Sequence, residues 1–116
     1  MPRTKPSPVL ILEDDELLRL TLAEELRAEG IEVFEARSEV EACTLLEANP
    51  DIGNVVTDVN LKGEPGGLRF CSKVQADNPR CRIIIASGQT IAEGTVPGAL
   101  ILPKPYEVSD VLAGLR

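Results

Sequence analysis

The chain has 116 residues, of which 43% are hydrophobic and only 3% aromatic, so a single globular domain with an aliphatic core is expected. Its 19 acidic residues outnumber its 12 basic ones, and the net charge of −7 argues against direct binding to nucleic acid or to an anionic membrane. The three cysteines form no C-x-x-C pair and the chain has no histidine, so we expect reduced thiols and no zinc site.

The first third of the chain predicts a strand, a helix and a second strand. Residues 9–12 are all apolar, which is typical of a strand buried on both faces of a parallel sheet. Leucines and alanines then recur at helical spacing over residues 17–28, and Gly30 supplies a stop signal for that helix. Residues 31–36 alternate apolar and polar side chains and predict the second strand.

A second helix and a third strand follow. Ser38, with Glu41 three residues later, is a capping-box pattern that opens the helix, and residues 49–51 end it. Residues 55–57 predict a short third strand that stops at Asp58. The chain therefore continues to alternate helix with buried strand.

The second half of the chain repeats this alternation. Residues 62–67 are a loop by composition, and a helix covers about residues 68–76. Residues 82–86 and 99–102 predict the fourth and fifth strands, and a final helix begins near Glu107. Strands that alternate with helices in this way predict a parallel sheet with helices on both faces.

Polar side chains collect at the carboxyl ends of the predicted strands, where open α/β sheets bind ligands. The residues at these ends are Glu13 and Asp14 after the first strand, Asp58 after the third, Ser87 after the fourth and Lys104 after the fifth. Carboxylates at short range repel each other at low dielectric, and a hard divalent cation relieves that repulsion. The sequence therefore predicts a small open cation site with a hydroxyl and an ammonium group beside it.

Each of these residues also has an ordinary structural explanation. The acidic residues 13–16 could cap the following helix and interact with its dipole. Asp58 could form an Asx-turn, and Lys104 could be a solvated surface residue. Their occurrence at the ends of separate strands in one chain, with compatible charges, favours a functional site.

These motifs resemble the receiver domain of two-component response regulators, and the resemblance covers almost the whole chain. Residues 10–15 resemble the first strand and acidic pair of that family, and residues 55–61 resemble its phosphoacceptor segment. Ser87 falls at the hydroxyl position, residues 104–105 match the family's Lys-Pro, and Gly66 matches the glycine of the loop after the acceptor.

The resemblance implies a chemistry. A phosphohistidine on a sensor histidine kinase or phosphotransfer protein would donate a phosphoryl group to Asp58, while Ser87 and Lys104 bind the phosphoryl oxygens. A metal ion, Mg²⁺ or Mn²⁺, would be held by Glu13, Asp14, Asp58 and the backbone carbonyl of Asn60. The chain would catalyse only its own phosphorylation and dephosphorylation, so an enzyme acting on a separate substrate is not expected.

The resemblance also implies a fold, from which this chain departs at one place. The family fold is an α/β, flavodoxin-like, doubly wound five-stranded parallel sheet with strand order 2-1-3-4-5, and the bond between residues 104 and 105 is often cis. Here, residues 90–98 contain two glycines and a proline and allow about one helical turn, so the fourth helix is expected to be short or absent. Ile101 stands where the family usually has an aromatic residue, so the usual effector surface is not carried over.

Residues 1–116 are expected to form one receiver domain, with residues 1–7 as a flexible N-terminal segment. The N-terminus lacks the apolar region of a signal peptide, and no apolar stretch approaches the length of a membrane span, so a cytoplasmic location is expected. A downstream protein effector completes the expected partners, and homodimerisation stays open.

Two alternatives belong to other functional classes. A pseudo-receiver would bind a partner without phosphorylation, although the presence of every acceptor-site residue argues against it. A haloacid-dehalogenase type phosphatase would need a D-x-D motif, whereas Asp58 is followed by Val, Asn and Leu at residues 59–61.

Overall fold

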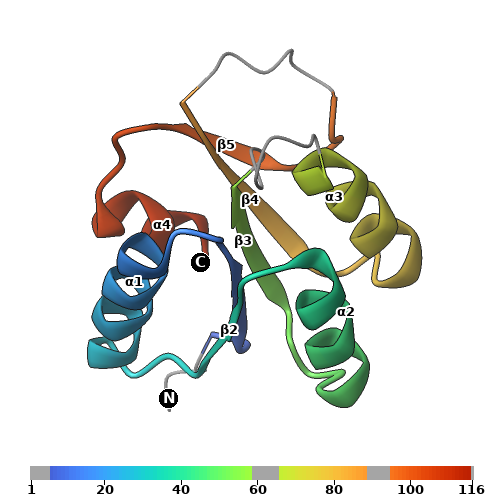
Figure 1. Ribbon diagram of the computed structural model, residues 1–116, viewed down its shortest axis with the longest axis horizontal. Coiled ribbons are helices and arrows are strands. Elements are labelled where there is room, and N and C mark those ends of the chain that lie inside the picture. Colours follow the sequence, from blue (N-terminus) through green and yellow to red (C-terminus); the bar gives the residue numbers. More distant parts are fainter. Residues whose placement is uncertain (1–5, 59–65, 89–94, 116) are drawn as a thin grey trace, which may run out of the picture.

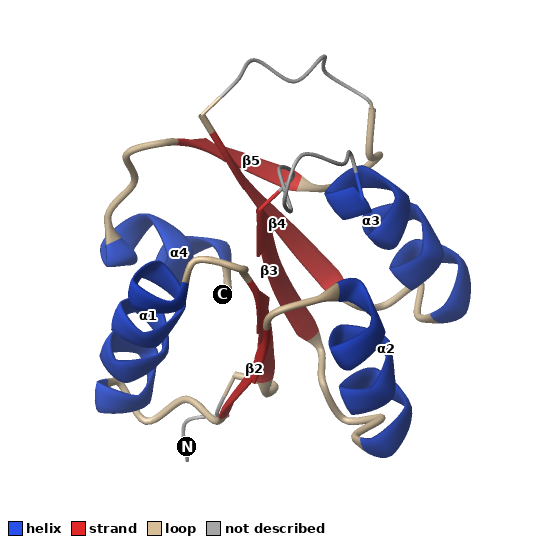
Figure 2. Ribbon diagram, viewed as in Figure 1, coloured by secondary structure: helices blue, strands red, loops and turns tan. Residues whose placement is uncertain are grey.

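The computed structural model describes residues 6–58, 66–88 and 95–115. A five-stranded parallel sheet forms its centre, with α1 and α4 on one face and α2 and α3 on the other (Figures 1 and 2). The strands are β1 (Val9–Leu12), β2 (Val33–Ala36), β3 (Asn54–Asp58), β4 (Arg82–Ser87) and β5 (Leu100–Pro103). The helices are α1 (Glu16–Ala28), α2 (Glu39–Ala48), α3 (Gly66–Asp77) and α4 (Val108–Gly114). The strand order β2-β1-β3-β4-β5 confirms the predicted flavodoxin-like topology.

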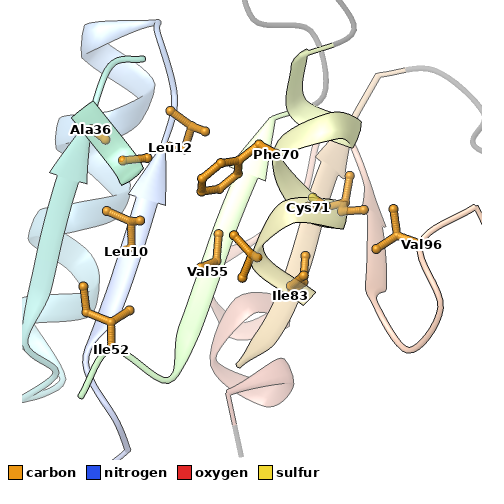
Figure 3. Close-up of a cluster of buried hydrophobic side chains, with 12 residues drawn as sticks. Leu10, Leu12, Ala36, Ile52, Val55, Phe70, Cys71, Ile83 and Val96 are labelled. Atoms are coloured by element: carbon orange, nitrogen blue, oxygen red, sulfur yellow. The ribbon is translucent and has the colours of Figure 1, made fainter. Parts of the chain in front are cut away.

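Two apolar layers hold the helices to the sheet, because neighbouring side chains of a strand point to opposite faces. Leu10, Leu12 and Val55 point toward α2 and α3 and pack around the fully buried Phe70 of α3 (Figure 3). Val9 and Ile11 point the other way, toward α1 and α4. Both faces of the central strands are therefore dry, as the apolar run at residues 9–12 predicted.

Helix α1 begins and ends at the expected signals. Asp15 is its N-cap, and its side chain accepts a hydrogen bond from the backbone N–H of Leu18 at 3.0 Å. Gly30 follows the helix with a φ of +82°, a conformation that favours glycine. The backbone N–H of Ile31 donates to the carbonyl of Leu26, so Ile31 completes the helix end and β2 begins only at Val33.

The apolar face predicted for α1 is partly wrong. Leu17, Leu18 and Leu20 are exposed, at 74%, 48% and 41% of their surface. The buried face instead combines Leu22, Ala23 and Leu26 with a charged residue, and that residue is Arg19. Leucines spread around most of the helix, so their spacing alone could not identify the buried stripe.

The connection between β4 and β5 departs from the rest of the fold in the way the sequence indicates. Its described part, residues 95–99, forms a turn without a helix, and Gly98 has a φ of +79°. Val96 packs into the core beside α3, and the side-chain amide of Gln75 donates to the carbonyl of Pro97. The prediction for residues 90–94 lies outside the described residues. None of the helices in the described ranges has the length and apolar character needed to cross a bilayer.

Candidate functional site

The register of the sheet brings the carboxyl ends of its strands to one edge. Leu12 of β1 pairs with Thr57 of β3, and Asp58 pairs with Ala86 of β4, so the residues that follow these pairs lie close together. We call the polar residues at this edge the rim residues. They are Glu13, Asp14, Asp58, Ser87 and Lys104.

Lys104 joins two of the acidic rim residues. Its Nζ lies 2.6 Å from Oδ2 of Asp58 and 3.7 Å from Oε1 of Glu13. Both carboxylate side chains are only 10% exposed, whereas the Lys104 side chain is 27% exposed. Lys104 lies 91 positions after Glu13 and 46 positions after Asp58 in the chain. These three residues, at the ends of β5, β1 and β3, therefore share one charge cluster.

The backbone fixes Lys104 beside the end of β4. The N–H of Lys104 donates to the carbonyl of Ser87 at 2.8 Å, and the peptide bond between Lys104 and Pro105 is cis, as the resemblance implied. Ser87 is 1% exposed and is the last residue of β4. The predicted hydroxyl and ammonium residues are thus adjacent through their backbones.

The charge balance of the rim favours a cation. Burial raises the pKa of Glu13 from 4.5 to about 7; the backbone N–H of Asp15 and the Lys104 charge oppose that rise, while the Asp58 charge adds to it. Burial alone would lower the pKa of Lys104, but its hydrogen bond to Asp58 and the charges of Asp58 and Glu13 raise it, so the amine is an ammonium at neutral pH. One ammonium therefore faces more than one carboxylate.

The donor chemistry of the rim fits Mg²⁺ or Mn²⁺, which prefer carboxylate oxygens. Within the described ranges, no three Asp, Glu or Cys side chains already stand as a complete metal-binding group. Glu13 and Asp58 nevertheless supply buried oxygen donors, and Asp14 is half-buried on the turn between β1 and α1. Asn60, the fourth predicted ligand, lies outside the described residues.

Arg19 is a rim neighbour that the sequence analysis did not single out. Its Nη1 donates to the backbone carbonyl of Glu13 at 3.1 Å, and Arg19 itself is only 6% exposed. The sequence does indicate that Arg19 is buried, because it stands three, four and seven residues before Leu22, Ala23 and Leu26. These spacings place it on the buried face of α1. A cation at such a position requires buried acceptors, and an end of a neighbouring strand supplies one.

An apolar groove adjoins the rim between α1 and the chain that leads into α4. It measures about 950 Å³. Leu17, Leu18, Pro105 and Tyr106 line it, and Lys104 lies at its border with the rim. The exposed leucines of α1 therefore form part of a concave surface beside the charge cluster.

The chain is similar to known proteins of one family. Residues 9–115 match the family described as the response regulator receiver domain. The chain is 31% identical over 117 residues to the transcriptional regulatory protein PdtaR of Mycobacterium tuberculosis, covering 96% of this chain and 56% of that regulator. It is 35% identical over 79 residues to a cyclic di-GMP phosphodiesterase of Thermotoga maritima, covering 68% of this chain and 20% of the other. The chain thus spans between a fifth and about half of the length of these relatives.

A solved structure also resembles the chain. It is a response regulator protein from Burkholderia pseudomallei, described as having a phosphorylated aspartic acid, a calcium ion and citrate. Its TM-score is 0.83 at 26% sequence identity, and the match covers 95% of this chain and 66% of that chain.

Proposed function

This chain belongs to the response regulator receiver domain family, and from that premise we propose that Asp58 accepts a phosphoryl group from a phosphohistidine of a two-component signalling partner. The observation that carries the proposal is the charge-assisted hydrogen bond of 2.6 Å between Lys104 and Asp58 at the end of β3. It places a cation beside the one carboxylate that ends a central strand. The acceptor and a group able to neutralise the incoming charge are therefore already together.

The transfer is a substitution at phosphorus. An oxygen of the Asp58 carboxylate attacks in line, a P–O bond forms as the P–N bond of the phosphohistidine breaks, and the electron pair of that bond stays on the leaving imidazole. The product is an acyl phosphate on Asp58. Little covalent chemistry is left to the protein, so its contribution is positioning and charge neutralisation.

Lys104 and Ser87 would perform that neutralisation. The Lys104 ammonium, paired with the Asp58 carboxylate before transfer, would follow the negative charge onto a phosphoryl oxygen. The Ser87 hydroxyl would donate to another phosphoryl oxygen from the end of the neighbouring strand. Both groups stand on strand ends rather than on long loops, which limits the reorganisation needed during the reaction.

We assign the metal site to Glu13, Asp14 and Asp58, with the backbone carbonyl of Asn60 as a further ligand. A bound Mg²⁺ or Mn²⁺ would neutralise charge on the phosphoryl oxygens. A nearby cation would favour the charged form of Glu13, whose pKa burial raises to about 7. The carboxylates hold the cation, and the chain acts only on its own Asp58.

The partner would be a histidine kinase or phosphotransfer protein in the cytoplasm, and a conformational change on phosphorylation would reach a downstream protein effector. The apolar groove at Leu17, Leu18 and Tyr106 supports a protein donor, because it offers contact area directly beside Lys104. A donor seated there would bring its phosphohistidine to the rim.

The test is intact-mass spectrometry after incubation with acetyl phosphate. We expect an increment of about 80 Da that requires Mg²⁺ and is absent from Asp58→Asn. The Asp14→Ala variant should need far more Mg²⁺ for the same increment. A wild-type protein that remains unmodified at any Mg²⁺ concentration would instead indicate a pseudo-receiver, which binds its partner without phosphorylation.

A further inference from the structure

Arg19 is a buried cation in the middle of the apolar face of α1. Its Nε donates to Oε1 of Glu35 on β2 at 3.3 Å, and its Nη1 donates to the backbone carbonyl of Glu13 at 3.1 Å. Its Nη2 also lies 4.0 Å from a carboxylate oxygen of Glu16, an exposed residue one helical turn earlier. One guanidinium thus connects the helix to β2 and to the residue that follows β1.

Such a residue is costly to bury. A guanidinium taken out of water destabilises the fold unless ion pairing and hydrogen bonds replace its hydration. An aliphatic residue would fill the same place beside Leu22 and Ala23 without that cost. The position of Arg19 therefore needs an explanation beyond the packing of α1.

The contacts of Glu13 supply that explanation. Its N–H donates to the carbonyl of Ala36 at 3.1 Å, its carbonyl accepts from Arg19, and its Oε2 accepts from the N–H of Asp15 at 3.1 Å. Arg19 and Asp15 are themselves linked, because the N–H of Arg19 donates to the carbonyl of Asp15 at 3.0 Å. Hydrogen bonds at Glu13 and at Asp15 thus fix the turn on both sides of Asp14.

We propose that Arg19 is a positioning residue for the cation site, which fixes the carbonyl of Glu13 and thereby the directions of the Glu13 and Asp14 carboxylates. The inference rests on the proposed function, since it assumes that these carboxylates bind a metal ion. Arg19 acts through the backbone and not by contact with the metal or with the phosphoryl group. Its ion pair with Glu35 holds the guanidinium in the orientation that reaches Glu13.

The chain contains a matched control for this role. Arg27 is on the same helix and pairs with the same carboxylate, with its Nη1 3.0 Å from Oε2 of Glu35, and its Nη2 donates to the carbonyl of Val33 at 2.9 Å. Its side chain is 47% exposed, and these contacts are with β2 and not with Glu13. Loss of Arg27 therefore weakens the tie between α1 and β2 without releasing the acidic turn.

The experiment compares Arg19→Gln with Arg27→Gln by calorimetric titration with Mg²⁺ alone. Groups that orient metal ligands typically contribute about tenfold to metal affinity, so we expect the Mg²⁺ dissociation constant to rise about tenfold in Arg19→Gln and less than about twofold in Arg27→Gln. At saturating Mg²⁺, phosphorylation of Arg19→Gln by acetyl phosphate should approach the wild-type rate. Hydrogen exchange at the N–H of Glu13, measured without metal, should accelerate in Arg19→Gln only.

The outcomes separate this inference from the proposed function. If the wild-type protein binds no Mg²⁺, the cation site is refuted. If the wild-type protein binds Mg²⁺ and a folded Arg19→Gln variant binds it equally tightly, only the role of Arg19 is overturned. If Arg19→Gln does not fold, Arg19→Lys takes its place, because a lysine keeps the charge but cannot serve Glu35 and Glu13 through two separate nitrogens. A folded Arg19→Lys protein with wild-type Mg²⁺ affinity and wild-type exchange at Glu13 would also overturn the inference.

Discussion

The interior of the sheet and its carboxyl edge are built on different principles. In the interior, aliphatic side chains from every strand share the burial, and Phe70 is surrounded by residues of the same character. At the edge, one ammonium, one hydroxyl and three carboxylates gather from the ends of β1, β3, β4 and β5, and these three kinds of group have different chemical roles. Many interior residues therefore share the same chemistry, whereas the ammonium and the hydroxyl each occur once among the rim residues.

This difference implies that substitutions in the two regions separate stability from function. A change in the interior should lower the free energy of unfolding and leave the chemistry of the folded molecules intact. A change at the rim should alter metal binding or phosphorylation in a protein that still folds. The predictions below test this separation, from the largest expected effect to the smallest.

Phe70→Ala should have the largest effect. Because Phe70 is fully buried, its removal leaves a cavity, and the free energy of unfolding should fall by about 3–5 kcal/mol. Urea denaturation measures this change, and Phe70→Leu is the control with a smaller cavity. If the fraction of Phe70→Ala that stays folded could no longer be phosphorylated, interior and rim would not be separable.

Lys104→Met should have the next largest effect, which is on the rate of phosphorylation of Asp58. Removal of a positioned cation from a transfer site costs on the order of 100-fold, so phosphorylation by acetyl phosphate should slow by about that factor at saturating Mg²⁺. Time-resolved intact-mass spectrometry measures the rate. The exposed Lys73 provides the control, since Lys73→Met removes the same charge outside the rim. Equal rates in the two variants would count against a role of Lys104 in the transfer.

The stability of the metal-free protein should depend on pH through Glu13. Its pKa rises from 4.5 to about 7 on folding, so the folded state holds the proton more tightly than the unfolded state. The contribution of Glu13 to stability is therefore fully present below about pH 4.5 and is lost by about pH 7, a change of about 1–3 kcal/mol. Denaturation with chelator present at several pH values measures it, and Glu13→Gln should flatten the profile. A profile unchanged by Glu13→Gln would locate the titration elsewhere.

Thiol labelling should give the smallest but most local signal. Burial raises the pKa of Cys71 to about 12 and of Cys81 to about 11, and Cys71 is fully buried beside Phe70. At pH 8 an alkylating reagent should therefore reach Cys71 only through unfolding, while the half-buried Cys43 and Cys81 react sooner. Mass spectrometry of the labelled peptides measures the three rates. Rapid labelling of Cys71 in the folded protein would indicate that the interior opens more readily than its packing implies.

The strands and the rim residues at their ends could be predicted from the sequence. Residues 9–12 could be recognised because an apolar run of that length is typical of a buried strand, and Asp58 and Lys104 could be recognised because they end such strands. The register then brings them together, since parallel strands share an edge. These predictions depended only on local pattern and on the direction of the chain.

Where a prediction needed side-chain partners, the sequence was insufficient. Leu17 and Leu18 fit a helical pattern, yet they line an open groove because the opposite face of α1 packs on the sheet. The role of Arg19 could not be recognised from the sequence because its acceptors are Glu35 on β2 and the carbonyl of Glu13, the residue that follows β1. A buried charge is explained by its partners, and only the tertiary structure identifies them.

The most direct test of the account is to locate the phosphoryl group within the intact chain. After reaction with acetyl phosphate and Mg²⁺, electron-transfer fragmentation of the whole protein should place the increment of about 80 Da on Asp58. An increment on another carboxylate, such as Asp14, or one that forms equally well without Mg²⁺, would contradict the account.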